Sequence, residues 1–190
     1  MAQEIADYLE KQGNPPQPKI PVNLLKNITG LPSLRISQVT NFWLKPIGHA
    51  RGHVSPDRKF NEERDRLHFA KRRPKNIAVG DILIAFAVGS GKVISVYKMM
   101  TLPHYAPAEE RWPWYVTGKN MTQAYGHDWW ANDLDIYRLQ DAFEKKHLET
   151  NIKPRGVQSF DGFKWGLDRM QITPNFGNFI LEMVDQKSKK

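Results

Sequence analysis

Two short apolar runs joined by a glycine turn place the strongest constraint on the fold. The segment 79–100, VGDILIAFAVGSGKVISVYKMM, opens with a Gly-Asp turn and contains two runs rich in β-branched residues. The GSG sequence between the runs supplies the backbone freedom that a tight reversal needs. The pattern therefore predicts two antiparallel strands joined as a hairpin. The GSGK stretch inside this turn lacks the full phosphate-loop pattern and is interpreted as part of the turn.

Two elements are predicted ahead of the hairpin. The segment 40–48, TNFWLKPIG, mixes aromatic and β-favouring residues and predicts a first strand. The segment 62–76 is polar and rich in charge. It predicts a helix that ends near Arg73, because Pro74 stops it.

Several short elements are predicted after the hairpin. The sequence WPWYVTGKNM predicts a strand and a turn at GKN. Residues 133–146 fit a strand followed by a helix, and Leu134, Ile136 and Leu139 suit either period. The last segment, GFKWGLDRMQITPNFGNFILEMV, predicts two strands separated by TPNFGN. Many short strands with a few short helices predict an α+β fold with a small, curved or closed sheet.

The first 39 residues have a different composition from the rest. Residues 2–12 predict a short amphipathic helix, and the Pro-rich segment 13–21 predicts an extended linker. The chain is therefore divided into an N-terminal extension (1–39), a main domain (40–184) and a basic tail (185–190). The extension is the candidate attachment point for a partner protein.

Composition excludes several classes of protein. The chain has no cysteine, so neither a disulfide framework nor a Cys-ligated zinc site is available. No secretory h-region opens the sequence, and the apolar runs are shorter than the ~20 residues that a membrane span needs. A cytoplasmic protein without a membrane partner is expected.

Basic residues are concentrated in one segment. The formal net charge is +8, and residues 45–75 hold ten Lys or Arg against four acidic residues. Such an excess favours an anionic partner, although a solvated loop and helix would show the same composition. The candidate phosphate-binding residues are Lys45, Arg51, Arg58, Arg66, Lys71, Arg72, Arg73 and Lys75.

Four of the six tryptophans lie between residues 111 and 130. On an extended strand Trp112 and Trp114 share one face, while Trp129 and Trp130 point to opposite faces. Tryptophan is usually core, yet each pair can place one ring inside and one at the surface. The region is therefore expected to supply both core and a reading surface.

The order of these pieces resembles the EVE branch of the PUA-like β-barrel superfamily. Residues 41–44, NFWL, match its opening strand, with Phe42 in place of the usual tyrosine. Residues 79–81 match the Gly-Asp start of its hairpin, and residues 90–91 match the glycine turn. The resemblance covers about residues 40–184.

The resemblance implies a PUA-like, EVE-type small curved or closed β-barrel flanked by short helices. It also implies a nucleic-acid-binding module, for DNA or RNA, that accommodates a methylated or hydroxymethylated base in an aromatic pocket. Aromatic rings return roughly 1–3 kcal/mol per stacked base, which offsets the cost of flipping one out. The aromatic and polar candidates for this pocket are Asn41, Trp43, Ser90, Trp112, Trp114, Asn120 and Trp129.

Two other functions compete with this interpretation. The first is a small nuclease or hydrolase like the ASCH-type relatives, with His49 or His53 as general base and Lys45 or Arg51 at a phosphate. Glycines disfavour a helix around the two histidines, so no metal site is predicted, and no catalytic motif or cofactor fingerprint is present. The second is an adaptor for RNA or protein. A binding module is favoured over an enzyme, and no catalytic residue, metal or cofactor is assigned.

Overall fold

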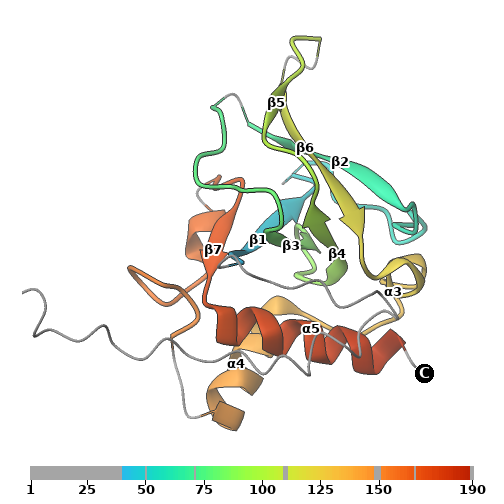
Figure 1. Ribbon diagram of the computed structural model, residues 1–190. Helices are drawn as coiled ribbons and strands as arrows, with labels where there is room; N and C mark the ends of the chain where they lie inside the picture. Colours follow the sequence, from blue (N-terminus) through green and yellow to red (C-terminus); the bar gives the residue numbers. More distant parts are fainter. Residues whose placement is uncertain are drawn as a thin grey trace, which may run out of the picture. The chain divides into compact units, whose positions relative to one another are not determined.

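The computed structural model describes residues 40–49, 51–70, 72–108, 111–147, 151–164 and 166–188. These residues form an α+β domain around one mixed, curved sheet (Figure 1). The α+β class predicted from the sequence is confirmed, and the sheet is curved but not closed. The predicted helix at 2–12 and the linker at 13–21 lie outside the described residues.

Seven strands make up the sheet. They are β1 (Phe42–Ile47), β2 (Arg64–Phe69), β3 (Ile82–Ala87), β4 (Val93–Met99), β5 (His104–Tyr105), β6 (Trp114–Asn120) and β7 (Met170–Ile172). Their order is β2-β6-β4-β3-β1-β7, with β5 paired to β6. Only β1 and β3 run parallel among the described pairs, and the others are antiparallel. The predicted first strand and the predicted β3–β4 hairpin are both confirmed.

The helices are α3 (Gln123–His127), α4 (Ile136–His147) and α5 (Pro174–Ser188), with a 3-10 turn η1 (Asp161–Phe163). Phe143 of α4 contacts Phe176 and Phe179 of α5, with ring centroids 5.2 and 5.5 Å apart. Gly177 of α5 lies so close to the Phe42 ring that a Cβ there would overlap it. A search of the described helices finds none that is both long and apolar enough to span a bilayer.

The predicted helix at 62–73 is wrong, because this segment contains β2. Its burial alternates along RDRLHF, with Leu67 and Phe69 buried and Arg64 and Arg66 exposed. This period of two is the signature of a strand with one solvated face. Residues 64–69 all pair with β6, and this pairing explains why the segment forms a strand and not a helix.

Two further predictions are corrected. The second strand expected after TPNFGN is the helix α5, in which buried Phe176, Phe179 and Ile180 follow helical spacing from Pro174 at its first position. Helix α5 runs through Ser188 and so includes part of the predicted basic tail. The GKN turn expected at 118–120 is part of β6, which reverses after it.

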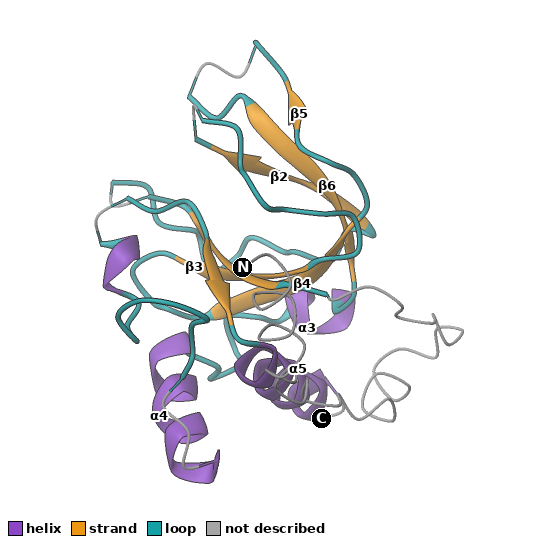
Figure 2. Cartoon of the chain, turned by 60° about the vertical axis from the view of Figure 1, so that its left-hand side comes forward, coloured by secondary structure: helices purple, strands orange, loops and turns teal. Residues whose placement is uncertain are grey.

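The sheet has a covered half and a bare half. In the covered half, Phe42, Ile84 and Val96 share the face that meets α4 and α5, and all three are buried. Figure 2 shows β2, β5 and β6 standing away from these helices. This bare half continues the same face of the sheet. Its boundary with the covered half runs through β4, where Val96 is buried and Lys98 is partly exposed and belongs to the bare part.

Candidate nucleic-acid interface

Three cations stand side by side on the bare half of the sheet. Lys119 of β6 is the register partner of Arg64 in β2 on one side and of Lys98 in β4 on the other. We name these three residues the basic row. Neighbouring strands lie ~4.8 Å apart, so the backbone positions of the three cations lie within about 10 Å. Like charges directly opposite each other destabilise a sheet, so the row costs the free protein stability.

The basic row lacks acidic partners within the described part of the chain. Arg64 is exposed and Lys98 and Lys119 are partly exposed. None of the three belongs to an ion pair formed between described residues. The row is therefore available to an external anion.

A shallow, open depression of about 600 Å³ lies at the β2 end of the row, lined by Arg64, Asp65, Arg66 and Thr117. Arg66 and Thr117 are register partners and follow the row one step along the strands on the same face. Asp65 adds a carboxylate, whose Oδ2 accepts a hydrogen bond from the Tyr97 hydroxyl at 3.4 Å. Cations still outnumber acids along its lining.

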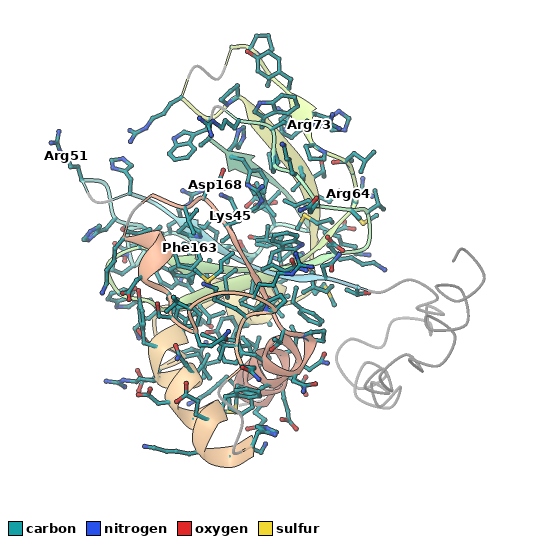
Figure 3. The ribbon with its side chains drawn as sticks, turned by 90° about the vertical axis from the view of Figure 1, so that its left-hand side faces the viewer. Lys45, Arg51, Arg64, Arg73, Phe163 and Asp168 are labelled. Carbon is teal, nitrogen blue, oxygen red and sulfur yellow. The ribbon has the colours of Figure 1, made fainter. Side chains whose placement is uncertain are left out.

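The predicted phosphate-binding residues do not gather on one surface. Figure 3 shows two members of the set well apart, with Arg51 at one side of the domain and Arg73 near its upper end. Lys71 lies outside the described residues, and Lys45 is buried. The exposed members of the predicted set are Arg51, Arg58, Arg66, Arg72, Arg73 and Lys75. Their contact with phosphate stays a prediction, and Arg66 is the member that joins the bare face beside the basic row.

Lys45 lies in the interior and not on the surface that the charge count suggested. It is 3% exposed, and its Nζ lies 4.4 Å from the centre of the Phe69 ring. Nζ donates one long hydrogen bond, 3.4 Å, to the backbone oxygen of Asp168. Burial lowers the pKa of Lys45 to about 8; the Asp168 carboxylate acts against this shift and the Arg169 guanidinium adds to it. This ammonium does not reach a ligand on the outer surface.

Side chains, and not backbone pairing, bring the two ends of the curved sheet together. The Asp168 carboxylate accepts hydrogen bonds from the Ala70 amide at 3.2 Å and from Nη1 of Arg169 at 2.8 Å. The Arg169 guanidinium lies 5.8 Å from the Phe69 ring centre. We name this junction of Lys45, Phe69, Asp168 and Arg169 the seam, because it joins β1 and β7 to β2.

Two predicted pocket residues hold a buried carboxylate. Trp43 is 5% exposed and donates from Nε1 to Oδ2 of Asp81 at 2.9 Å. Asn41 donates from both its backbone and its side-chain nitrogen to Oδ1 of Asp81, each at 3.1 Å. The amide of Ala78 donates a fourth hydrogen bond. Asp81 of the Gly-Asp motif thus anchors β1 to β3. The hydrogen bond to Asp81 uses Nε1, which is the one polar atom of the Trp43 side chain.

Three more predicted pocket residues lie in interior or turn contacts. Trp129 is 0% exposed and donates from Nε1 to the backbone oxygen of Arg58 at 2.7 Å. The buried Asn120 side chain donates to the Phe60 oxygen and accepts from the Ser95 hydroxyl, both at 2.8 Å. Ser90 accepts a hydrogen bond from the Lys92 amide within the β3–β4 turn. These contacts give each residue a structural role, and their part in base binding stays untested.

Trp112 and Trp114 are the predicted pocket aromatics that remain partly exposed among the described residues. The Trp114 ring lies 5.1 Å from that of Tyr105, which is 59% exposed, and 5.9 Å from the Arg73 guanidinium. The Arg111 guanidinium lies 5.5 Å from the Trp112 ring. We name Tyr105, Trp112 and Trp114 the aromatic corner. Two of the seven candidates thus lie near the start of β6, each with a cation close to its ring.

The two histidines of the HARGH segment make local contacts, and a role for either as a general base stays a prediction. Nδ1 of His49 accepts a hydrogen bond from the Arg51 amide at 3.2 Å. The His53 ring packs against Gly89, where a Cβ would lie 2.8 Å from it. Within the part of the chain that the structure describes, no three His, Asp or Glu side chains are placed to hold a metal ion.

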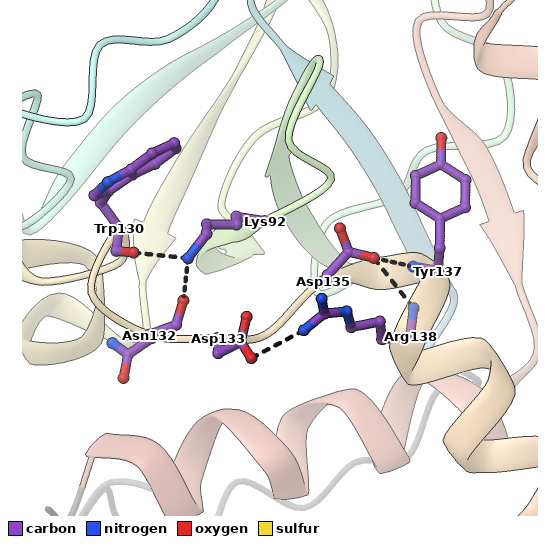
Figure 4. A network of polar contacts seen from close by, with 7 residues as sticks. All are labelled: Lys92, Trp130, Asn132, Asp133, Asp135, Tyr137 and Arg138. Carbon is purple, nitrogen blue, oxygen red and sulfur yellow. Dashed lines mark hydrogen bonds and ion pairs between the residues drawn. The ribbon is translucent and has the colours of Figure 1, made fainter.

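The lysine of the GSGK turn is used to join the hairpin to α4. Figure 4 shows Nζ of Lys92 donating to the backbone oxygens of Trp130 at 2.8 Å and Asn132 at 3.0 Å. Next to it, Oδ1 of Asp135 accepts from the first free amides of α4. The interpretation of GSGK as a structural turn agrees with these contacts.

None of the three members of the basic row belongs to the phosphate-binding set predicted from the sequence. Arg64 was assigned to a helix, and neither Lys98 nor Lys119 lies in the basic segment 45–75. The alternation of charged and apolar residues in RDRLHF was a usable signal for an outward-facing Arg64 and Arg66. The strand register that brings Arg64, Lys98 and Lys119 side by side cannot be predicted from a single sequence.

No protein-family model matches this chain, and neither does any curated protein. Two solved structures are similar to it. Human THYN1 protein, in complex with 5-methylcytosine containing DNA, aligns with 76% of this chain and 98% of its own at 10% identity and a TM-score of 0.45. Protein Atu2648 from Agrobacterium tumefaciens aligns with 76% of this chain and 93% of its own at 12% identity and a TM-score of 0.42. Both TM-scores are below 0.5, and neither similarity assigns a ligand to this chain.

Proposed function

We propose that this chain is a nucleic-acid-binding module of the EVE, PUA-like type, which holds phosphates on the basic row and reads a modified base with the aromatic corner. The basic row carries the proposal. Three cations in one register row, without acidic partners among the described residues, lower the stability of the free protein. A ligand with closely spaced negative charges removes this repulsion, and a phosphodiester backbone has that spacing.

Phosphate contacts provide affinity without sequence preference. Each cation that neutralises a phosphate releases counterions, so the logarithm of the affinity falls with the logarithm of the salt concentration at a slope of about −0.9 per contact on duplex DNA. A three-membered row together with Arg66 predicts about four such contacts. Affinity is therefore expected to fall steeply with salt and to be similar for different sequences.

Base reading requires an aromatic surface within reach of the bound strand. Strand register places Trp114 and Tyr105 on the face of the sheet opposite to Lys119, so a base has to reach the aromatic corner around the edge of the sheet. The aromatic corner provides partly exposed rings, and Arg73 and Arg111 lie close to them. A methyl group adds only about 0.8 kcal/mol on burial, so selectivity for a modified base has to come from the shape of the contact. The base that is bound and its modification are identified by the binding experiment below.

The test is a titration of labelled oligonucleotides at several salt concentrations, with fluorescence anisotropy as the readout. The set contains unmodified DNA and RNA and matched strands with methylated cytosine, hydroxymethylated cytosine or methylated adenine. The double variant Arg64→Gln/Lys119→Gln is expected to weaken binding to every member equally and to reduce the duplex salt slope by about 1.8. Trp112→Leu is expected to reduce the preference for the modified base.

Lys145→Gln is the matched control, because Lys145 is an exposed lysine of α4 in the covered half. It removes one positive charge without touching the bare face and is expected to leave affinity within about twofold. The double variant removes two charges and the control removes one, so the losses are compared per charge removed. If the two variants lose the same affinity per charge, net charge alone drives binding and the proposed phosphate site is wrong. Absence of salt-dependent binding to all oligonucleotides would refute the proposed function.

A further inference from the structure

A second register row, made of rings, crosses the same bare face of the sheet. Tyr115 of β6 is the register partner of His68 in β2 and of His104 in β5. Its ring centre lies 5.7 Å from that of His68 and 5.6 Å from that of His104. We name His68, Tyr115 and His104 the ring row. His104 is exposed and the other two are partly exposed.

The ring row and the basic row lie on one face at a defined separation. Tyr115 and Lys119 are four residues apart on β6, so their side chains point to the same side of the sheet about 13 Å apart along the strand. Thr117 and its partner Arg66 stand between them. The Arg66 guanidinium lies 5.1 Å from the Tyr115 ring and connects the charged part of the face to the aromatic part.

His68 fixes the position of the ring row relative to the aromatic corner. Its Nδ1 lies 3.0 Å from the backbone oxygen of Trp112. Since a carbonyl oxygen can only accept, Nδ1 carries the proton and donates, which leaves Nε2 on the open side of the ring. The ring row is therefore held in place by the strand pairing and by this hydrogen bond.

A face with cations at one end and rings at the other matches a single strand better than a duplex. A duplex stacks its bases inside and presents phosphates and groove edges, so it would engage the basic row and leave the rings without stacking partners. A single strand exposes base faces next to its phosphates. Proteins that bind single strands combine a positive surface with aromatic stacking in this way.

We propose that the bare face of β2, β4, β5 and β6 binds single-stranded nucleic acid, with phosphates at the basic row and unpaired bases against the ring row. The inference rests on the proposed function, since it uses the same basic row and adds the class of nucleic acid. The 13 Å between the rows corresponds to about four nucleotides at the stacked spacing of ~3.4 Å per nucleotide, and to fewer in an extended strand.

The test compares a labelled 12-nucleotide DNA strand of mixed, unmodified sequence with its own duplex, by fluorescence anisotropy at fixed salt. The single strand is expected to bind about tenfold more tightly than the duplex. Tyr115→Leu is expected to weaken single-strand binding about tenfold and to leave duplex binding within about twofold, because stacking is worth roughly 1–3 kcal/mol per base. Tyr115→Phe keeps the ring and is expected to retain single-strand affinity.

Two results overturn the inference and spare the proposed function: equal or tighter binding of the duplex, or equal loss for both ligands in Tyr115→Leu. Tyr115→Leu could also lower the unfolding temperature while Tyr115→Phe restores it. An equal loss of binding with that pattern would show that Tyr115 only supports the fold, and this result too overturns the inference. If neither oligonucleotide binds, both the inference and the proposed function fail. The variant Lys119→Gln tests the proposed function separately from the inference. If the basic row binds phosphate, this variant weakens the binding of both the single strand and the duplex.

Discussion

One continuous face of the sheet is used in two ways in this molecule. In the covered half the outward positions of β1, β3 and β4 are Phe42, Ile84 and Val96, and the helices bury them. In the bare half the equivalent positions of β2 and β6 include Arg66 and Lys119. The comparison shows that the helices determine which part of the face is core. Beyond the helices the same face holds cations that have no acidic partner among the described residues.

The largest expected difference between the halves is in stability. Phe176→Ala removes a fully buried ring that contacts Phe143 and is expected to lower the free energy of unfolding by about 3–5 kcal/mol. Thr117→Ala in the bare half is expected to change it by less than about 0.5 kcal/mol. Denaturant titration of both variants measures this. Equal costs would contradict the division into a covered and a bare half.

A smaller effect is expected at the seam, where β1 of the covered half meets β2 of the bare half. Folding lowers the pKa of Lys45 to about 8 from the 10.5 of an exposed lysine, so between pH 8 and 10.5 the unfolded chain binds more protons. Stability therefore rises with pH in this window, by up to about 3 kcal/mol, and is unaffected by this group below it. Lys45→Met should remove the rise and be at least as stable as wild type at pH 7.

The seam experiment is best restricted to pH 7–9.5. Burial raises the pKa values of Tyr97 and Tyr125. Because the folded protein keeps these tyrosines neutral, they lower its stability as pH rises above 10, which opposes the effect of Lys45. Urea titrations of wild type and Lys45→Met at intervals across this range give the comparison. A pH dependence that persists in Lys45→Met would assign it to another group.

The smallest expected effect concerns the basic row itself. Lys119→Gln removes the central charge of the row, which relieves repulsion with both Arg64 and Lys98. The free protein is expected to gain about 0.2–1 kcal/mol of stability at low salt, and less at high salt because ions screen exposed charges. Thermal unfolding at two salt concentrations measures the gain. A loss of stability in Lys119→Gln would mean that Lys119 makes a favourable interaction within the free protein. The proposed repulsion in the basic row would then be wrong.

The sequence predicted the elements whose signal is local. The β3–β4 hairpin was found because apolar runs and a glycine turn lie within 22 residues, and the first strand was found for a similar reason. The strand β2 was missed because its polar face resembles a solvated helix until β6 pairs with it. The last strand was wrongly expected because TPNFGN looks like a turn, whereas Pro174 begins α5.

The candidate site was predicted less well than the fold. Composition indicated an anionic partner and pointed to Arg66, yet Arg64, Lys98 and Lys119 come together only through strand register. Aromatic residues could not be sorted into core and surface from spacing alone. Trp43 and Trp129 are buried by contacts with distant parts of the chain, Asp81 and the Arg58 backbone, which one sequence does not reveal.

The order of the strands has a consequence for when the interface exists. Strand β2 precedes the β3–β4 hairpin in the sequence, but among the described strands its partner is β6, about 50 residues later. Neither the basic row nor the ring row can form on a partly made chain, because each needs β6 and β2 in register. A molecule that has not finished folding therefore has the same net charge but lacks both rows. If the rows bind nucleic acid as proposed, specific retention on an immobilised strand reports completion of the fold.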